Sequence, residues 1–174
     1  MAERGLSLDP YNPFAHMIVM YLYYHAGRAE QALKQRALAL AVNPQYPGIF
    51  ITAALAHERR GDMDEAIAGY RKACEQTGDA PFVLSFLTHA LAVSGREAEG
   101  REVLQRLLAR PGSHLDLSIA YAGLRDRDAT LAHLEAAARE RDIHMQGVPA
   151  DRRYDWLRSD PRFQAILQQM GLKQ

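Results

Sequence analysis

The chain has 174 residues, of which 48% are hydrophobic, so it is long and apolar enough to bury a core and is not intrinsically disordered. Its 21 Lys and Arg residues balance its 21 Asp and Glu residues, which gives no electrostatic reason to expect a nucleic acid or an anionic membrane as partner. A single cysteine, Cys74, excludes an internal disulfide. Without a run of about 18 apolar residues or a secretory signal, we expect a cytoplasmic protein that does not span a membrane.

Turn-forming and small residues recur along the chain at an interval of 34 residues, as from Gly27 to Gly61. The recurring sets are Gly27, Gly61 and Gly95; Pro13, Pro47 and Pro81; Pro10 and Pro44; Ala32 and Ala66; and Ala39 and Ala73. Five sets that share one period indicate an internal repeat, and repeats of this length are typical of solenoid folds.

Residues 1–10 fit the same period, because Leu6 and Pro10 fall on Leu40 and Pro44 after a shift by one repeat. We therefore expect this segment to be the second helix of a partial upstream repeat. A solenoid normally needs a capping element at each end. The sequence thus predicts either a fragment of a longer protein or an N-terminal end that packs on something else.

Residues 13–46 and 47–80 each read as two helices. The first helix begins at or after the proline, where the missing N–H costs nothing, and the turn glycine ends it. A second helix follows, and the spacing of Asp62 and Glu65 predicts a capping box at its start in the second unit. The alanines at positions 32, 39, 66 and 73 are expected where paired helices approach most closely.

The rest of the chain follows the period less closely. Residues 81–110 predict a shortened third unit, residues 111–144 a degenerate fourth unit, and residues 145–174 C-terminal capping helices. In the last segment Asp160 is the expected helix cap, Pro161 the first helical residue and Gly171 the terminator. One apolar face is predicted for Phe163, Ile166, Leu167 and Met170.

The chain resembles the tetratricopeptide repeat family over about residues 1–140, because that family repeats a helix-turn-helix unit of 34 residues. The matching positions of the first unit are Val19, Met20, Tyr23, Gly27, Ala32, Arg36, Ala39 and Pro44. Those of the second unit are Ala53, Ala54, His57, Gly61, Ala66, Tyr70, Ala73 and Gly78. The family's early tryptophan is absent throughout, and Arg36 replaces an aromatic residue.

The resemblance implies an all-α fold, a right-handed α-solenoid of helix-turn-helix pairs closed by a C-terminal capping helix. The ending "LRSDPRF" is similar to the tail of tetratricopeptide arrays in multidomain bacterial signalling proteins. Those arrays follow cyclase, kinase or winged-helix DNA-binding domains. A regulatory or sensor region of such a protein is therefore one alternative for this chain.

No motif in the sequence indicates a known type of catalytic site. His57 and Glu58 begin like a zinc protease motif, but Gly61 stands where the second histidine is required. The seven histidines contain no pair spaced by three or four residues. We therefore expect no catalytic residues, no metal site, no cofactor and no enzyme.

A binding surface is the predicted functional site, because the first helix of each pair lines the concave groove in which the family binds peptides. The predicted groove residues are Phe14, Met17, Tyr21, Tyr24, His25, Ile51, Leu55, Glu58, Arg59, Phe82, Ser85 and His89. The family's lysine and asparagine clamp for a terminal carboxylate is absent from this face. The expected occupant is a protein or peptide, with upstream repeats, another domain or a second copy in a homodimer as the alternatives.

Overall fold

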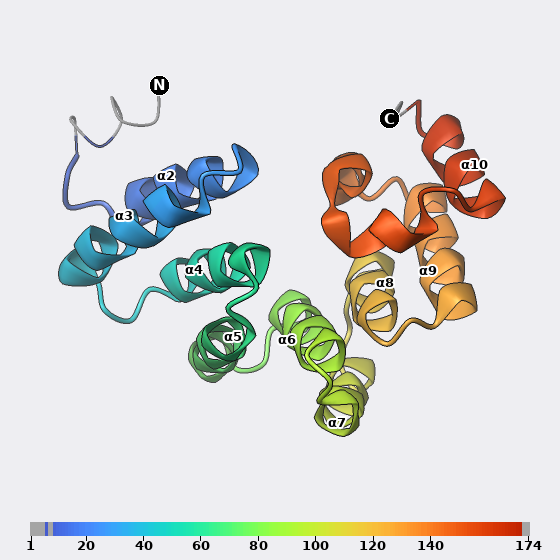
Figure 1. Ribbon diagram of the computed structural model, residues 1–174, viewed down its shortest axis with the longest axis horizontal. Helices are drawn as coiled ribbons and strands as arrows, with labels where there is room; N and C mark the ends of the chain where they lie inside the picture. Colours follow the sequence, from blue (N-terminus) through green and yellow to red (C-terminus); the bar gives the residue numbers. More distant parts are fainter. Residues whose placement is uncertain (1–5, 7–8, 172–174) are drawn as a thin grey trace. The chain divides into compact units, whose positions relative to one another are not determined.

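The computed structural model describes Leu6 and residues 9–171 and shows an all-α chain. Within residues 9–171 there are nine α-helices and two 3₁₀-helices, and no strand (Figure 1). The all-α prediction is confirmed. The helix predicted over residues 1–10 falls largely on residues 1–5 and 7–8, which lie outside the described residues.

The chain divides into two compact units, Met1–Val83 and Leu84–Gln174. The first contains α2 (Pro13–His25), α3 (Ala29–Val42), α4 (Pro47–Arg60) and α5 (Met63–Thr77), and α6 (Pro81–Val93) begins at its end. The second continues with α7 (Glu97–Leu108), α8 (His114–Gly123), α9 (Arg127–Arg139), η1 (Ile143–Ala150), η2 (Arg152–Leu157) and α10 (Pro161–Gln169).

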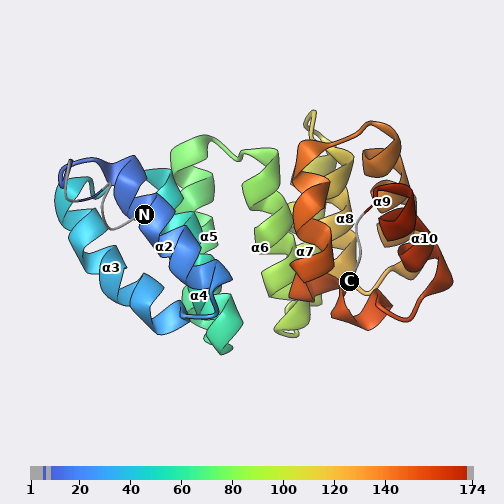
Figure 2. The ribbon, with the colours of Figure 1, turned by 90° about the horizontal axis from the view of Figure 1, so that it is seen from above.

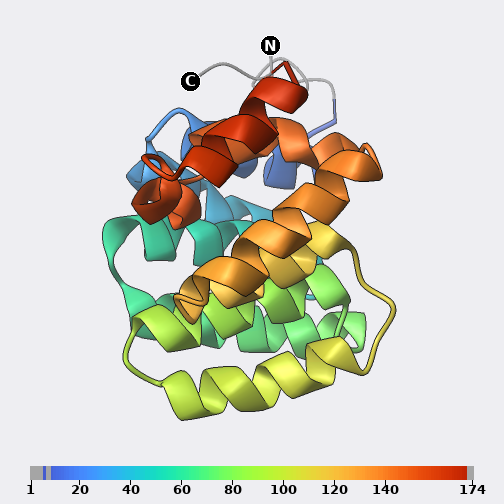
Figure 3. The same cartoon turned by 90° about the vertical axis from the view of Figure 1, so that its right-hand side faces the viewer.

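Helices pack mainly against their neighbours in sequence within each unit. In the first unit α2 packs on α3, α4 packs on α5, and α4 also contacts α2 and α3 (Figure 2). In the second unit α8 packs on α9, and α9 contacts α10 (Figure 3). Consecutive packing of this kind is the arrangement of an α-solenoid, in which each helix pair is buried by the next.

The predicted turns follow from local backbone chemistry. Asn12 caps α2 by accepting hydrogen bonds from the backbone N–H groups of residues 14 and 15, and Pro13 is the first helical residue. Gly27, Gly61 and Gly95 take left-handed φ angles of +75°, +87° and +83°, which a side chain would disfavour. The turn glycines predicted from the period therefore do break the helices.

Small residues fill the closest helix contacts of the first unit. Ala32, Ala39, Ala66 and Ala73 are all fully buried, in agreement with the sequence. Ala32 and Ala39 belong to a core cluster with Met20 and Ile49. Larger side chains at these positions would overpack the helix interfaces.

The second unit has its own core, built from α8, α9 and the C-terminal segment. Asp160 caps α10, Pro161 is its first residue, and Phe163, Ile166 and Leu167 are buried as predicted. The fully buried Tyr154 of η2 hydrogen-bonds Ser118 of α8, with 2.6 Å between the two hydroxyl oxygens. This bond satisfies two polar groups that would otherwise be costly to bury.

The capping box predicted for Asp62 and Glu65 is wrong. The Asp62 side chain makes no cap hydrogen bond to α5. Its carboxylate instead lies 3.3 Å from His57 Nδ1 and 3.1 Å from Arg60 Nε. His57 and Arg60, in the last turn of α4, bind the Asp62 carboxylate, which is therefore not used to cap α5. A complete capping box forms at Ser113 and Asp116 instead.

Candidate functional site

The first unit presents aromatic and apolar side chains on adjoining surfaces of α2 and α4. We call this surface the aromatic face; it consists of Phe14, Met17, Tyr21, Tyr24 and His25 of α2 with Ile51 and Arg59 of α4. Phe14 is 55% exposed and Tyr21 is 42% exposed. Exposed aromatic side chains that stand alone are ordinary, but several that gather on one surface mark an interaction site.

The aromatic rings on α2 form one contact group. The Tyr21 and His25 ring centroids lie 4.2 Å apart in an edge-to-face arrangement, and those of Tyr24 and His25 lie 5.0 Å apart. The Tyr21 and Tyr24 centroids are separated by 6.4 Å. Spacings of three and four residues bring these side chains to one side of the helix.

Arg59 adds a positive charge from α4. Its guanidinium carbon lies 5.6 Å from the centroid of the Tyr24 ring, within range of a cation–π contact. A Cβ atom added at Gly27 would lie 3.4 Å from the Arg59 guanidinium, so the turn after α2 also adjoins this charge. The aromatic face therefore combines apolar surface with an exposed cation.

Gly48 at the start of α4 makes room for a side chain of α2. A Cβ atom at this position would lie 2.9 Å from Cγ of Met17 and 2.8 Å from the Tyr46 ring, which is too close for either contact. Gly48 therefore lets Met17 pack on the start of α4. This contact lies where the two helices of the aromatic face meet.

The other residues of the predicted groove lie in different surroundings. Leu55 is buried, and the Glu58 carboxylate accepts a 2.7 Å hydrogen bond from the hydroxyl of the buried Tyr70. On α6, Phe82 is 43% exposed, whereas Ser85 and His89 are buried. Leu55, Ser85 and His89 thus present little surface to a partner, and the aromatic face excludes them.

A histidine pair in the second unit was missed from the sequence. His114 Nδ1 of α8 lies 2.9 Å from His133 Nδ1 of α9, and Tyr121 stacks on the His133 ring with centroids 5.4 Å apart. Burial lowers the pKa of His133, and the neighbouring His114 lowers it further. The two histidines are separated by 19 residues across a helical hairpin, and this separation is the only hint of the contact in the sequence. The same separation joins His16 to Gln35 in the first unit.

The described part of the chain contains neither a cluster of metal-ligating side chains nor a helix that could span a membrane. No three His, Cys, Asp or Glu side chains among residues 9–171 and Leu6 converge as metal ligands. In the same part of the chain, every helix is too short or too polar to cross a bilayer. Cys74 is buried.

Comparison of the sequence with protein-family models and with curated proteins finds no match. The geometry of the aromatic face defines an apolar and cationic surface on an α-helical scaffold.

Proposed function

We propose that this chain is a protein-interaction module of the tetratricopeptide type that binds a peptide or helix of a partner protein on the aromatic face. The observation that carries the proposal is the exposure of Phe14 and Tyr21 beside the ring group of Tyr24 and His25. The repeat period and the consecutive helix pairs support the family assignment. A cytoplasmic scaffold role without catalysis belongs to the same proposal.

The chemistry of the aromatic face favours one kind of partner segment. Exposed rings favour large apolar side chains, which gain most from burial against them. Arg59 favours a carboxylate close to those side chains, since a charge-assisted hydrogen bond to guanidinium is strong and directional. The expected ligand is a short segment that carries one or two apolar anchors and an adjacent acidic residue.

Selection from a displayed library of random peptides on the immobilised chain tests this function directly. We expect the selected peptides to share apolar anchors with a neighbouring acidic residue. The double substitution Tyr21→Ser and Tyr24→Ser should weaken their binding by about tenfold or more, since buried aromatic anchors dominate interface energies. Binding is measured by fluorescence anisotropy and helicity by circular dichroism.

Tyr11 provides a matched control, because it is 81% exposed and precedes α2. Tyr11→Ser removes an aromatic ring without touching the aromatic face and should leave peptide binding unchanged. Arg59→Glu is a second variant at an exposed position, and it should weaken acidic peptides selectively. Equal binding by wild type and both face variants would refute the proposal. A dimer that the double substitution dissociates would instead identify a self-association surface.

A further inference from the structure

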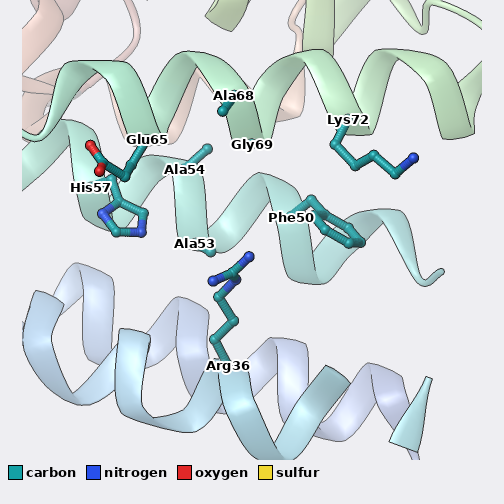
Figure 4. A pocket seen from close by; sticks show the side chains of 9 residues that line it. All are labelled: Arg36, Phe50, Ala53, Ala54, His57, Glu65, Ala68, Gly69 and Lys72. Atoms are coloured by element: carbon teal, nitrogen blue, oxygen red, sulfur yellow. The ribbon is translucent and has the colours of Figure 1, made fainter. Parts of the chain in front are cut away.

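A hollow of about 200 Å³ lies between α3, α4 and α5 of the first unit (Figure 4). Its lining residues are Arg36, Phe50, Ala53, Ala54, His57, Glu65, Ala68, Gly69 and Lys72. Figure 4 shows the Arg36 side chain reaching from α3 toward Ala53, with Phe50 and Lys72 to one side of it. The small residues of α4 and α5 leave this space unfilled.

The hollow is separate from the aromatic face. The α4 residues that line it are positions 50, 53, 54 and 57, which share one side of the helix. Ile51 and Arg59 of the aromatic face point about a third of a turn or more away from the middle of that side, at about 100° per residue. A ligand in the hollow would therefore leave the proposed peptide surface open.

Arg36 is the residue that gives the hollow its chemistry. The equivalent position of the second unit is Tyr70. This tyrosine is fully buried, and its hydroxyl donates a hydrogen bond to the Glu58 carboxylate. Arg36 has no such acceptor: its Nε is buried without a hydrogen-bond partner. A buried guanidinium N–H that makes no bond is costly, and the cost is removed when an acceptor enters.

The charges around the hollow favour an anion. Arg36 and Lys72 are cationic, whereas Glu65 is the one acidic residue among those that line it. The Lys72 ammonium lies 3.0 Å from Glu75, but both side chains are exposed, and a pair of this kind contributes little. Lys72 can therefore exchange this partner for a ligand carboxylate at small cost.

We propose that the hollow binds a small aromatic carboxylate of about the size of benzoate. The ring would pack against Phe50 and the alanines of α4, and the carboxylate would accept hydrogen bonds from Arg36. The volume fits this ligand, because an apolar cavity of about 150 Å³ is known to hold a benzene molecule. Guanidinium and carboxylate match as a planar, two-pronged pair.

Titration of the full chain with benzoate, followed by ¹H–¹⁵N correlation spectra, tests the proposal. We expect shifts at the backbone amides of Ala53, Ala54 and Gly69. Benzyl alcohol serves as the neutral probe of the same size. Arg36→Gln should weaken benzoate binding by about tenfold or more, because it removes the guanidinium that pairs with the carboxylate. The same substitution should weaken benzyl alcohol binding by less than about twofold.

Two further variants keep the test decisive. Lys34→Gln removes an exposed positive charge from α3 outside the hollow and should leave benzoate binding unchanged. Ala68→Leu at an exposed position of the rim should fill the space and abolish binding of both probes. Absence of benzoate binding, or unchanged binding by Arg36→Gln and Ala68→Leu, overturns the proposal. So do shifts confined to residues outside the hollow.

Discussion

The Nδ1 atoms of His114 and His133 lie 2.9 Å apart across the hairpin of α8 and α9. At this distance one nitrogen donates a hydrogen and the other accepts it, so the pair requires at least one neutral ring in a defined tautomer. Protonation of both rings would place two N–H donors against each other and remove the bond. The contact therefore depends on pH.

This pair should make the second unit less stable in mild acid. Burial, together with His114, lowers the pKa of His133 below its ordinary value of 6.5. The unfolded chain then binds more protons than the folded chain below about pH 6.5, so the free energy of unfolding falls as pH falls from there toward the lowered pKa. Urea unfolding at about pH 7.5 and about pH 5.5 measures this loss.

His133→Gln supplies the comparison, because glutamine keeps a hydrogen-bonding side chain that does not titrate. The variant should lose less stability than the wild type between the two pH values. Titrating groups that do not contact His133 contribute equally to both proteins and cancel in the difference. The same loss in both would show that the histidine pair does not control the acid response.

The helical hairpins were predictable from the sequence because their signals are local. Pro13 and Pro47 start helices and Gly27 and Gly61 end them through backbone chemistry that does not depend on distant contacts. The histidine pair is different, since a separation of 19 residues becomes a contact only in one hairpin register. Spacing rules within a single helix could not reveal it.

Gly123 should be intolerant of alanine even though it is a helical residue, the last of α8. Replacement of a helix glycine by alanine ordinarily gains up to about 1 kcal/mol. Here the added Cβ would lie 2.5 Å from Cα of His89 and 3.1 Å from its carbonyl oxygen. Backbone atoms cannot yield as a side chain can, so we expect Gly123→Ala to cost about 1–3 kcal/mol in chemical unfolding.

Gly147 is the matched control for this substitution. A Cβ atom there would meet nothing within 4 Å, so Gly147→Ala should change stability by less than about 0.5 kcal/mol. Similar costs for the two alanine variants would show that α8 does not pack as closely on α6 as the structure indicates.

A capping box forms at the start of α8 but not at the start of α5, although both sequences have the required spacing. Ser113 accepts a hydrogen bond from the Asp116 N–H, and Asp116 accepts one from the Ser113 N–H. We expect Ser113→Ala to cost about 1 kcal/mol. Glu65→Ala should cost less than about 0.5 kcal/mol, because no box forms at α5.

Thermal and urea unfolding of the two variants check this contrast. A cost for Glu65→Ala equal to that for Ser113→Ala would show that the box at α5 forms in solution. The sequence could not distinguish the two sites, since both have a suitable acceptor and an acid three residues later. His57 and Arg60 decide the outcome by binding the Asp62 carboxylate, and only the fold brings that competition about.

Contacts between helices also limited how well the aromatic face could be predicted from the sequence. Helical spacing correctly groups Tyr21, Tyr24 and His25, whose rings are in contact. Spacing also assigned Glu58 to the groove, but it could not show that the hydroxyl of Tyr70 binds that carboxylate. Contacts between helices compete for a polar side chain, and a single helix does not reveal them.

Tyr70→Phe should measure the structural contribution of Glu58. The hydroxyl donates a 2.7 Å hydrogen bond to the carboxylate from a fully buried ring, and phenylalanine keeps the ring packing. A bond to a charged acceptor contributes about 1.5–3 kcal/mol, which is the expected loss in unfolding free energy. Glu58→Gln retains an acceptor oxygen and should cost less. If Tyr70→Phe leaves stability unchanged while Glu58→Gln weakens peptide binding, then Glu58 belongs to the binding surface rather than to the helix contact.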